Sequence, residues 1–216
     1  MRASELGLKV LNAVYPVRCG LCGELDDLPL CEACSSDFEP NARVVEHMDG
    51  LDFRYGVFRY KGRAAQAVTR LKYARSTTLG GPMARLLESA GSALGLFEGV
   101  VAVPVPIHWS RRAQRGFNQS ELLCEALPAG LVDVSLLRRV RATKPQAGLS
   151  VEERQRNLDG AFWASPSVSG RAVLLIDDVV TSGQTAKACA SALYAAGAIE
   201  VGILAFAGNP EQEEAI

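Results

Sequence analysis

The amino-acid sequence predicts an α/β protein with a mostly parallel sheet and helices on both of its faces. Short apolar runs at 100–106, 173–176 and 201–206 have the composition of strands that are buried on both sides. Segments with apolar residues at helical spacing alternate with these runs. The chain has 216 residues, of which 48% are hydrophobic, so it is long enough for one well-buried domain and a small appendage.

The overall charge does not point to any class of partner. The formal net charge is −1 and the isoelectric point is about 6.2, which gives no global reason to expect nucleic-acid binding. The same composition argues against a disordered or fibrous chain. Partners must therefore be inferred from local sites.

The N-terminal apolar run at 6–15 does not have the features of a secretion signal. Lys9 and Asn12 interrupt it, and no small-residue cleavage site follows it. The run is also too short to span a bilayer. Because its apolar residues fall on one side of a helix, we expect a short amphipathic helix packed against the rest of the protein. We therefore expect a cytoplasmic protein without a membrane span.

Four cysteines near the N-terminus form two Cys-x-x-Cys pairs separated by eight residues, which predicts a structural zinc site. Four thiolates leave no open position for chemistry on the metal. Two disulfides or a redox pair are the alternatives, although nothing in the sequence indicates secretion. The intervening segment carries only acidic charges, which disfavours phosphate binding there. The predicted metal ligands are Cys19, Cys22, Cys31 and Cys34.

Two parts of the chain are expected, a helix with the cysteine module at 1–45 and an α/β domain at 50–216. The segment 40–50 between them has the composition of a linker. The other two cysteines, Cys124 and Cys189, lie in apolar helical surroundings and are expected to be buried.

A strand and two helices are predicted at the start of the larger domain. Residues 53–60 alternate between apolar and other side chains, as a strand does. Apolar residues recur at helical spacing over 64–73 and 82–94, and they are expected to face the core. Between these helices, Lys72 can help to neutralise a diphosphate, or it can be an ordinary solvated lysine.

The run at 100–106 is a second buried strand, which its prolines terminate. A loop rich in arginine follows this strand and leads into a helix at 120–126. Such a loop before a helix is typical of an anion site. Its candidate residues are Arg111, Arg112, Arg115, Asn118 and Gln119.

The segment 173–185 carries the most specific signal in the chain. Four branched apolar residues predict a buried strand, and Asp177 and Asp178 follow where ligands of open α/β sheets bind. A loop rich in hydroxyl groups then enters a helix, where free N–H groups and Gly183 can cradle a phosphate. This pattern implies a phosphorylated sugar whose hydroxyls donate to the acids, with Mg²⁺ held through a diphosphate. The alternative is an ordinary strand-to-helix turn whose surface aspartates cap the helix.

The same stretch resembles the phosphoribosyl-pyrophosphate (PRPP) motif of type I phosphoribosyltransferases, which has four hydrophobic residues, two acids and a Thr/Ser-Gly-x-Thr loop. The resemblance implies the type I phosphoribosyltransferase fold, ribose binding by the acids and 5′-phosphate binding by the loop. It also implies that pyrophosphate lies near the arginine-rich loop. The expected PRPP contacts are Asp177, Asp178, Val179, Val180, Thr181, Ser182, Gly183, Gln184 and Thr185.

The order of motifs over nearly the whole chain is similar to that of the ComF family, which is linked to competence and DNA uptake. The paired cysteines, Val-Pro-Val-Pro at 103–106, Arg-Gly-Phe-Asn-Gln at 115–119 and the PRPP motif occur in that order. The segment 136–162 resembles the mobile hood that closes over PRPP in type I enzymes. Its candidate contacts are Lys144, Gln146, Arg154 and Asn157.

This resemblance predicts a transferase that uses PRPP and Mg²⁺, with an acceptor that the sequence does not identify. Its catalytic residues would be Lys72, Arg115, Asp177 and Asp178. A second interpretation is a non-catalytic sensor of PRPP or a nucleotide that contacts DNA-uptake proteins, such as a helicase. A third is direct binding of single-stranded DNA, because residues 108–156 hold nine Arg or Lys against five Asp or Glu.

Overall fold

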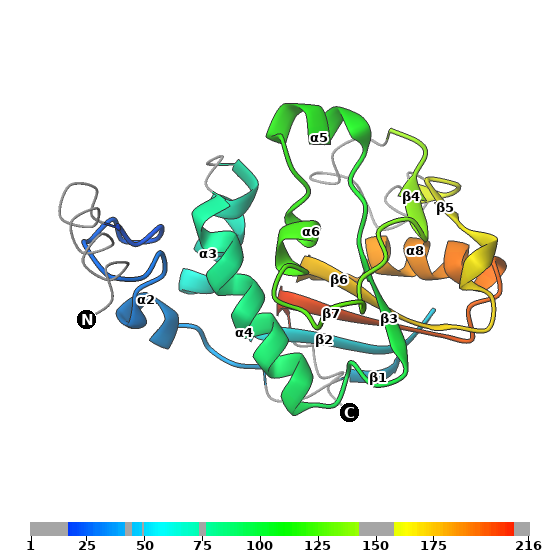
Figure 1. Cartoon of the computed structure of the whole chain (residues 1–216), viewed down its shortest axis with the longest axis horizontal. Coiled ribbons are helices and arrows are strands. Elements are labelled where there is room, and N and C mark those ends of the chain that lie inside the picture. The colour runs from blue at the N-terminus through cyan, green and yellow to red at the C-terminus, as the bar shows by residue number, and fades with distance from the viewer. Residues whose placement is uncertain (1–16, 42–44, 49, 74–76, 143–157, 210–216) are drawn as a thin grey trace, which may run out of the picture.

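The structure of the protein is a computed structural model that describes residues 17–41, 45–48, 50–73, 77–142 and 158–209. A five-stranded sheet lies at its centre, with the strand order β1-β2-β7-β6-β3 (Figure 1). All neighbouring strands are parallel except the edge strand β1, which is antiparallel to β2. The bounds of the strands are β1 (Val45–Met48), β2 (Leu51–Arg59), β3 (Val100–Pro104), β6 (Ala172–Val180) and β7 (Glu200–Gly208).

Helices cover both faces of this sheet, as the sequence predicts. Buried residues of β6 alternate between the two faces, because successive side chains of a strand point to opposite sides. Leu174 and Ile176 pack in the same cluster as α3, α4 and α6, whereas Val173 and Leu175 pack with α8. The bounds of these helices are α3 (Gly62–Tyr73), α4 (Gly80–Ala93), α6 (Gln119–Leu123) and α8 (Gln184–Ala195).

Smaller elements complete the described part of the chain. Helix α5 (Trp109–Arg115) lies between β3 and α6, and a two-stranded ribbon pairs β4 (Leu137–Arg139) with β5 (Phe162–Ala164). The 3-10 turns are η1 (Thr77–Leu79) and η2 (Pro166–Val168). In the described residues, no helix is both long enough and apolar enough to cross a membrane.

The cysteine module packs against the α3 side of the domain. It contains the short helix α2 (Glu32–Ser36), and its cysteines share a hydrophobic cluster with α3, η1 and α4. Phe38, just after α2, lies 5.2 Å from Phe58 on β2 and 5.7 Å from Phe206 on β7, measured between ring centroids. The module therefore continues the core of the larger domain.

Several sequence-based boundaries differ from the structure. The segment 40–50 is not wholly a linker, because β1 lies within it and pairs with β2. Strand β6 runs on to Val180, because β7 pairs with it beyond the four apolar residues. Helix α6 is shorter than predicted and ends at Leu123. The predicted helix at 6–15 lies outside the described residues.

Candidate functional site

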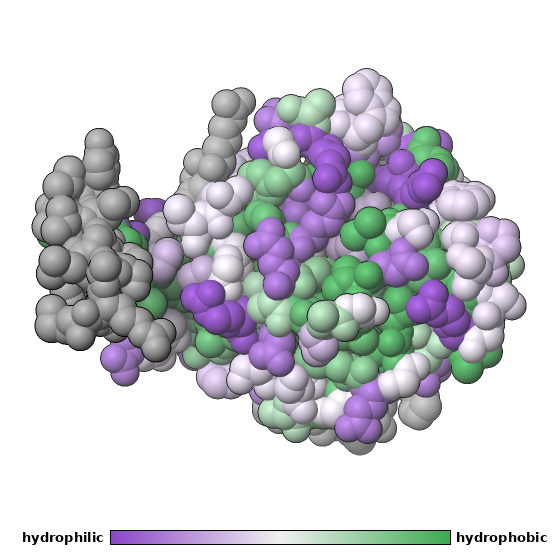
Figure 2. All heavy atoms as spheres, in the orientation of Figure 1, coloured by the Kyte–Doolittle hydropathy of each residue, from purple (hydrophilic) through white to green (hydrophobic). Residues whose placement is uncertain are grey.

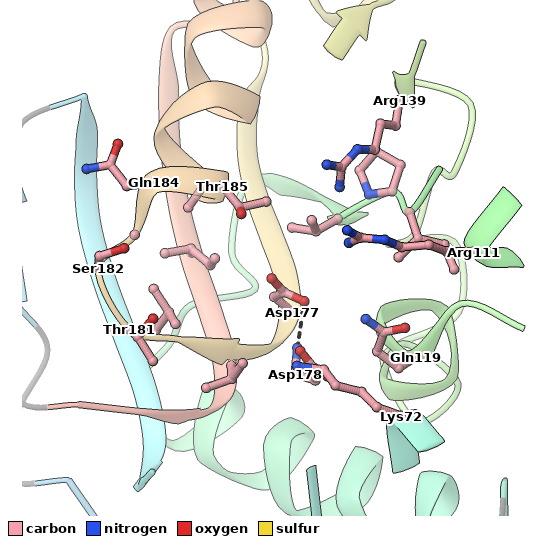
Figure 3. A pocket seen from close by; sticks show the side chains of 18 of the residues that line it. Lys72, Arg111, Gln119, Arg139, Asp177, Asp178, Thr181, Ser182, Gln184 and Thr185 are labelled. Carbon is pink, nitrogen blue, oxygen red and sulfur yellow. Dashed lines mark hydrogen bonds and ion pairs between the residues drawn. The ribbon is translucent and has the colours of Figure 1, made fainter. Parts of the chain in front are cut away.

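A cavity of about 250 Å³ lies at the carboxyl ends of β3 and β6, where the sequence places the ligand (Figure 3). The cavity exists because β6 continues after its neighbour β3 has ended. The last pair between these strands is Pro104 with Ile176, whereas β7 still pairs with β6 at Val180. The lining residues are Lys72, Tyr73, Val105, Pro106, Ile107, Arg111, Arg115, Gln119, Arg139, Ile203 and the continuous stretch 177–186.

Asp177 is the first residue of β6 beyond the end of β3. Its Oδ1 accepts hydrogen bonds from the hydroxyl of Ser120 at 3.0 Å and from the backbone N–H of Asp178 at 2.8 Å. Withdrawal from water and the neighbouring Asp178 raise the pKa of Asp177 to about 7, although Lys72 opposes this shift. The carboxyl group can therefore gain or lose a proton near neutral pH.

Asp178 is almost completely buried, with 2% of its surface exposed, and it forms an ion pair with Lys72. The distance from Lys72 Nζ to Asp178 Oδ2 is 3.0 Å (Figure 3). Burial lowers the pKa of Lys72, but the two carboxylates raise it by more, so the pKa lies above the ordinary value for lysine. Lys72 thus brings a positive charge to the wall of the cavity.

The loop after β6 has the geometry of an anion cradle. Gly183 has a φ of 70°, in the left-handed region that glycine adopts readily, and it is the N-cap of α8. The N-cap glycine makes no side-chain cap, so the positive end of the α8 dipole lies at this loop. Thr181 and Ser182 are exposed, while Gln184 and Thr185 are partly buried. The whole loop lines the cavity.

The opposite wall of the cavity is basic. Arg111 and Arg139 both face it, and withdrawal from water together with the charge of Arg111 lowers the pKa of Arg139 (Figure 3). Arg115 also lines the cavity, and its guanidinium lies 5.3 Å from the centre of the Tyr73 ring. Arg139 is on β4, within the segment 136–162 that resembles the hood, although it was not one of the four candidate contacts named there.

Two residues of the predicted anion loop do not line the cavity. Arg112 forms an ion pair with Glu121 at 2.5 Å. Asn118 is buried, donates to the carbonyl oxygen of Val105 at 3.1 Å, and accepts from the N–H of Ser120 at 3.1 Å. Asn118 therefore holds the loop in place, and through Ser120 it supports Asp177. Gln119 does line the cavity.

The four predicted hood contacts, Lys144, Gln146, Arg154 and Asn157, lie outside the described residues. Two residues that do shape the site, Tyr73 and Ser120, were not assigned to it from the sequence. Tyr73 follows the predicted Lys72 directly, and Ser120 follows Gln119. Adjacency to a predicted contact was the only sequence signal for either one.

The four cysteines of the module converge on one point. Their sulfur atoms all lie within 4.8 Å of one another, and no disulfide joins them. Four sulfurs bound at about 2.3 Å to one tetrahedral ion would stand about 3.8 Å apart. The distance between the sulfurs of Cys22 and Cys31 is 3.8 Å. The cluster therefore fits a tetrahedral metal ion, as the spacing of the cysteines predicts.

Backbone N–H groups already point at one of these sulfurs. The N–H groups of Leu21 and Cys31 donate to Cys19 Sγ, each at 3.4 Å. Burial raises the pKa of Cys19, but backbone hydrogen bonds lower it by more, to about 6. A thiolate is the form that binds a metal ion. Outside the module, Cys124 and Cys189 are both buried, as predicted.

Comparisons with known proteins agree with this architecture. A profile of the phosphoribosyl transferase domain matches residues 114–216, which include the loop and both acids. DNA utilization protein YhgH of Salmonella typhimurium is 36% identical over 194 residues, which cover 85% of this chain and 79% of that protein. Competence protein F of Haemophilus influenzae is 29% identical over 203 residues, which cover 84% of this chain and 87% of that protein.

Among solved structures, orotate phosphoribosyltransferase of Mycobacterium tuberculosis aligns with 74% of this chain and 74% of its own, at 17% identity and a TM-score of 0.37. The assignment of the chain to a family rests on the sequence relatives and the domain profile. This chain belongs to the ComF family of phosphoribosyltransferase-like proteins and has the type I phosphoribosyltransferase fold.

Proposed function

We propose that this protein binds PRPP with Mg²⁺ and transfers the phosphoribosyl group to an acceptor. One observation carries the proposal: a single cavity presents a helix N-terminus, two carboxylates and a wall of guanidinium groups. The helix N-terminus suits the 5-phosphate, and the carboxylates suit ribose hydroxyls as hydrogen-bond donors. The basic wall suits the pyrophosphate.

The proposed reaction exchanges one bond at the anomeric carbon for another. The bond to the pyrophosphate oxygen breaks and its electron pair stays on the pyrophosphate, while the acceptor's nucleophile bonds to the same carbon. The proton that the acceptor loses passes to the leaving pyrophosphate. Negative charge therefore grows beside Arg111, Arg115 and Lys72, which stabilise it. When bound to the diphosphate oxygens, Mg²⁺ would supply further charge stabilisation.

The test is calorimetric titration of PRPP and Mg²⁺, followed by measurement of pyrophosphate release with a panel of bases and amines. Binding with turnover that Asp177→Asn abolishes is the expected result. Binding without turnover for every acceptor would favour a sensor of PRPP instead of an enzyme. A protein that binds neither PRPP nor ribose 5-phosphate would refute both ideas.

The names of the relatives suggest the biological setting. One is named a DNA utilization protein and another a competence protein. We extend this link to the present chain as part of the proposal, so that the phosphoribosyl site would serve the handling of DNA taken up by the cell.

A second candidate function is direct binding of single-stranded nucleic acid, and exposed aromatic side chains beside arginines favour it. Trp109 on α5 is 73% exposed, and Arg112 follows three residues later on the same helix, a spacing that places two side chains on one helix face. Figure 2 shows hydrophilic side chains gathered over α5. Arg138 lies 5.7 Å from the ring of the exposed Trp163. Basic grooves with aromatic platforms are typical of proteins that bind single strands.

Two variants that leave the cavity intact test this candidate. Trp109→Ala and Arg112→Ala should weaken binding of a labelled oligonucleotide, and binding by the unchanged protein should fall steeply with salt. Both side chains lie outside the cavity lining, so PRPP binding should stay unchanged. Oligonucleotide affinity that is absent, or that does not depend on salt, would exclude this function.

A further inference from the structure

We propose that Arg54, a buried residue on β2, positions the phosphate-binding loop and holds a fixed positive charge beneath it. The inference rests on the proposed function, because it concerns the same loop. Arg54 is 4% exposed and is not part of the cavity lining. An arginine is always charged in proteins and is seldom buried without a specific role.

The guanidinium of Arg54 joins two strand ends. Its Nη1 donates to the carbonyl oxygen of Thr181 at 2.9 Å, and its Nη2 donates to that of Asn209 at 2.7 Å. Thr181 follows β6 directly and Asn209 follows β7 directly. Since β7 lies between β2 and β6 in the sheet, one side chain from the interior of β2 links the carboxyl ends of the two strands beyond it.

The bond to Thr181 also fixes the direction of the next N–H group. In a trans peptide the C=O and the N–H of the following residue point to opposite sides. The described residues contain no cis peptide bond, so the N–H of Ser182 points away from Arg54. Ser182 lines the cavity and Arg54 does not. Arg54 thus holds the loop in a conformation in which the N–H of Ser182 points away from the Arg54 side chain.

The charge of Arg54 lies close to the turn itself. A Cβ atom added at Gly183, the N-cap of α8, would be 4.0 Å from Nη1 of Arg54. A buried cation interacts more strongly with an anion than an exposed one does, because little water screens it. Arg54 therefore adds to the positive end of the α8 dipole on the side opposite to the bound phosphate.

The fork of the guanidinium makes arginine hard to replace here. A lysine keeps the charge but cannot donate along two fixed directions to two separate carbonyl groups. Arg54→Lys therefore keeps the positive charge but loses the paired hydrogen bonds that position the loop. Arg54→Met removes both the charge and the hydrogen bonds. Arg59, an exposed arginine on the same strand, provides a matched control as Arg59→Met.

The experiment is calorimetric titration of the full chain with two probes, ribose 5-phosphate and magnesium pyrophosphate. In the proposed site the first probe depends on the loop and the second on the basic wall. We expect Arg54→Lys to weaken ribose 5-phosphate binding by about tenfold, the loss typical of one charged hydrogen bond, and Arg54→Met to weaken it further. Magnesium pyrophosphate affinity should stay within about twofold in both variants and in Arg59→Met.

A purely structural role for Arg54 would weaken the binding of both probes. A loss of affinity limited to ribose 5-phosphate is therefore the distinguishing result. Equal weakening of both probes, or unchanged ribose 5-phosphate affinity in Arg54→Lys, would overturn the inference. If Arg54→Met fails to fold in a thermal melt, Arg54→Lys still decides the matter. Hydrogen exchange of the loop peptide at 181–185 should also be faster in Arg54→Lys than in Arg59→Met, and equal rates would count against positioning.

Failure of this inference and failure of the proposed function give different results. If the unchanged protein binds neither probe, the proposed function is wrong. If the unchanged protein binds both probes and the Arg54 variants match it, the proposed function stands and only the role of Arg54 is lost.

Discussion

The cysteine module and the cavity at the carboxyl end of β6 both bring several side chains together at one place, but they do so in opposite ways. The four sulfurs come from a single stretch of chain, 19–34, and two tight turns are enough to bring them together. The cavity draws its side chains from β6, α3, α5, β4 and the start of α8. Local geometry therefore builds the first site, whereas the second exists only in the folded sheet.

The two regions nevertheless share a supporting element. Arg70 on α3 donates from Nη1 to the carbonyl oxygen of Gly20 at 2.6 Å. Leu79 of η1 lies against Gly20, where an added Cβ would meet its side chain at 2.8 Å. Two residues after Arg70, Lys72 reaches Asp178 in the cavity. The module thus stabilises the helix that carries a charged group of the distant site.

The largest effect is expected from the loss of a metal ligand. Cys34→Ser should remove the metal and greatly lower the melting temperature, because binding by structural zinc sites is worth about 10 kcal/mol or more. Pyrophosphate affinity should fall as well, since α3 loses its support. Metal analysis and thermal unfolding measure these effects. The control is Cys124→Ser, which replaces a buried cysteine outside the cluster. Full pyrophosphate binding without metal would show that the two regions are independent.

The next effect concerns the ion pair between Lys72 and Asp178. Lys72→Met would leave a buried carboxylate without its partner, which should cost about 3 kcal/mol in the free energy of unfolding. The exposed pair of Lys61 with Glu39 is a matched control, and Lys61→Met should cost less than about 1 kcal/mol. Denaturant titration compares the two variants. Similar costs would mean that the buried pair has no special role.

A smaller loss of stability is expected where the module meets the domain. Gly20→Ala places a methyl group against the buried Leu79 side chain and should cost about 1–3 kcal/mol, as overpacking does. Metal content should stay unchanged, which separates docking of the module from metal binding. Gly81→Ala is the control, because its added Cβ meets only the end of the Arg85 side chain at 3.6 Å. An unchanged melting temperature for Gly20→Ala would argue against tight docking.

The last effect is a dependence on pH. The pKa of Asp177 is raised to about 7, so the folded protein holds this proton more tightly than the unfolded chain does. The free energy of unfolding should therefore decrease as pH rises from about 4 to 7, and Asp177→Asn should be relatively more stable at pH 8. Ribose 5-phosphate binding should strengthen over pH 6–8, by about tenfold at most, as the carboxylate becomes a full acceptor. Identical pH profiles for Asp177→Asn and the unchanged protein would contradict this assignment.

The sequence was informative wherever the signal is short-range. The apolar runs of β3, β6 and β7, the paired cysteines and the acid-loop pattern each lie within one continuous segment, and the structure contains the predicted strands and the sulfur cluster. Lys72 and the arginine-rich loop were found through the family resemblance, but other residues brought in from elsewhere were missed. Arg54 is 127 residues away from Thr181 in the chain, and Ser120 is 57 residues away from Asp177. No periodicity or spacing connects positions so far apart.

The sequence by itself determined the class of fold, and it predicted the convergence of the four cysteines and the place of the loop at 181–185 after β6. These follow from local backbone preferences and from side chains that act within a few residues of one another. Only the tertiary structure decided that β6 extends beyond the end of β3 and that Arg139 lines the cavity. It also decided that the Asn118 side chain is buried against Val105 and does not line the cavity. Each of these depends on the relative length and packing of separate elements. That is a property of the assembled sheet, and no single stretch of chain contains it.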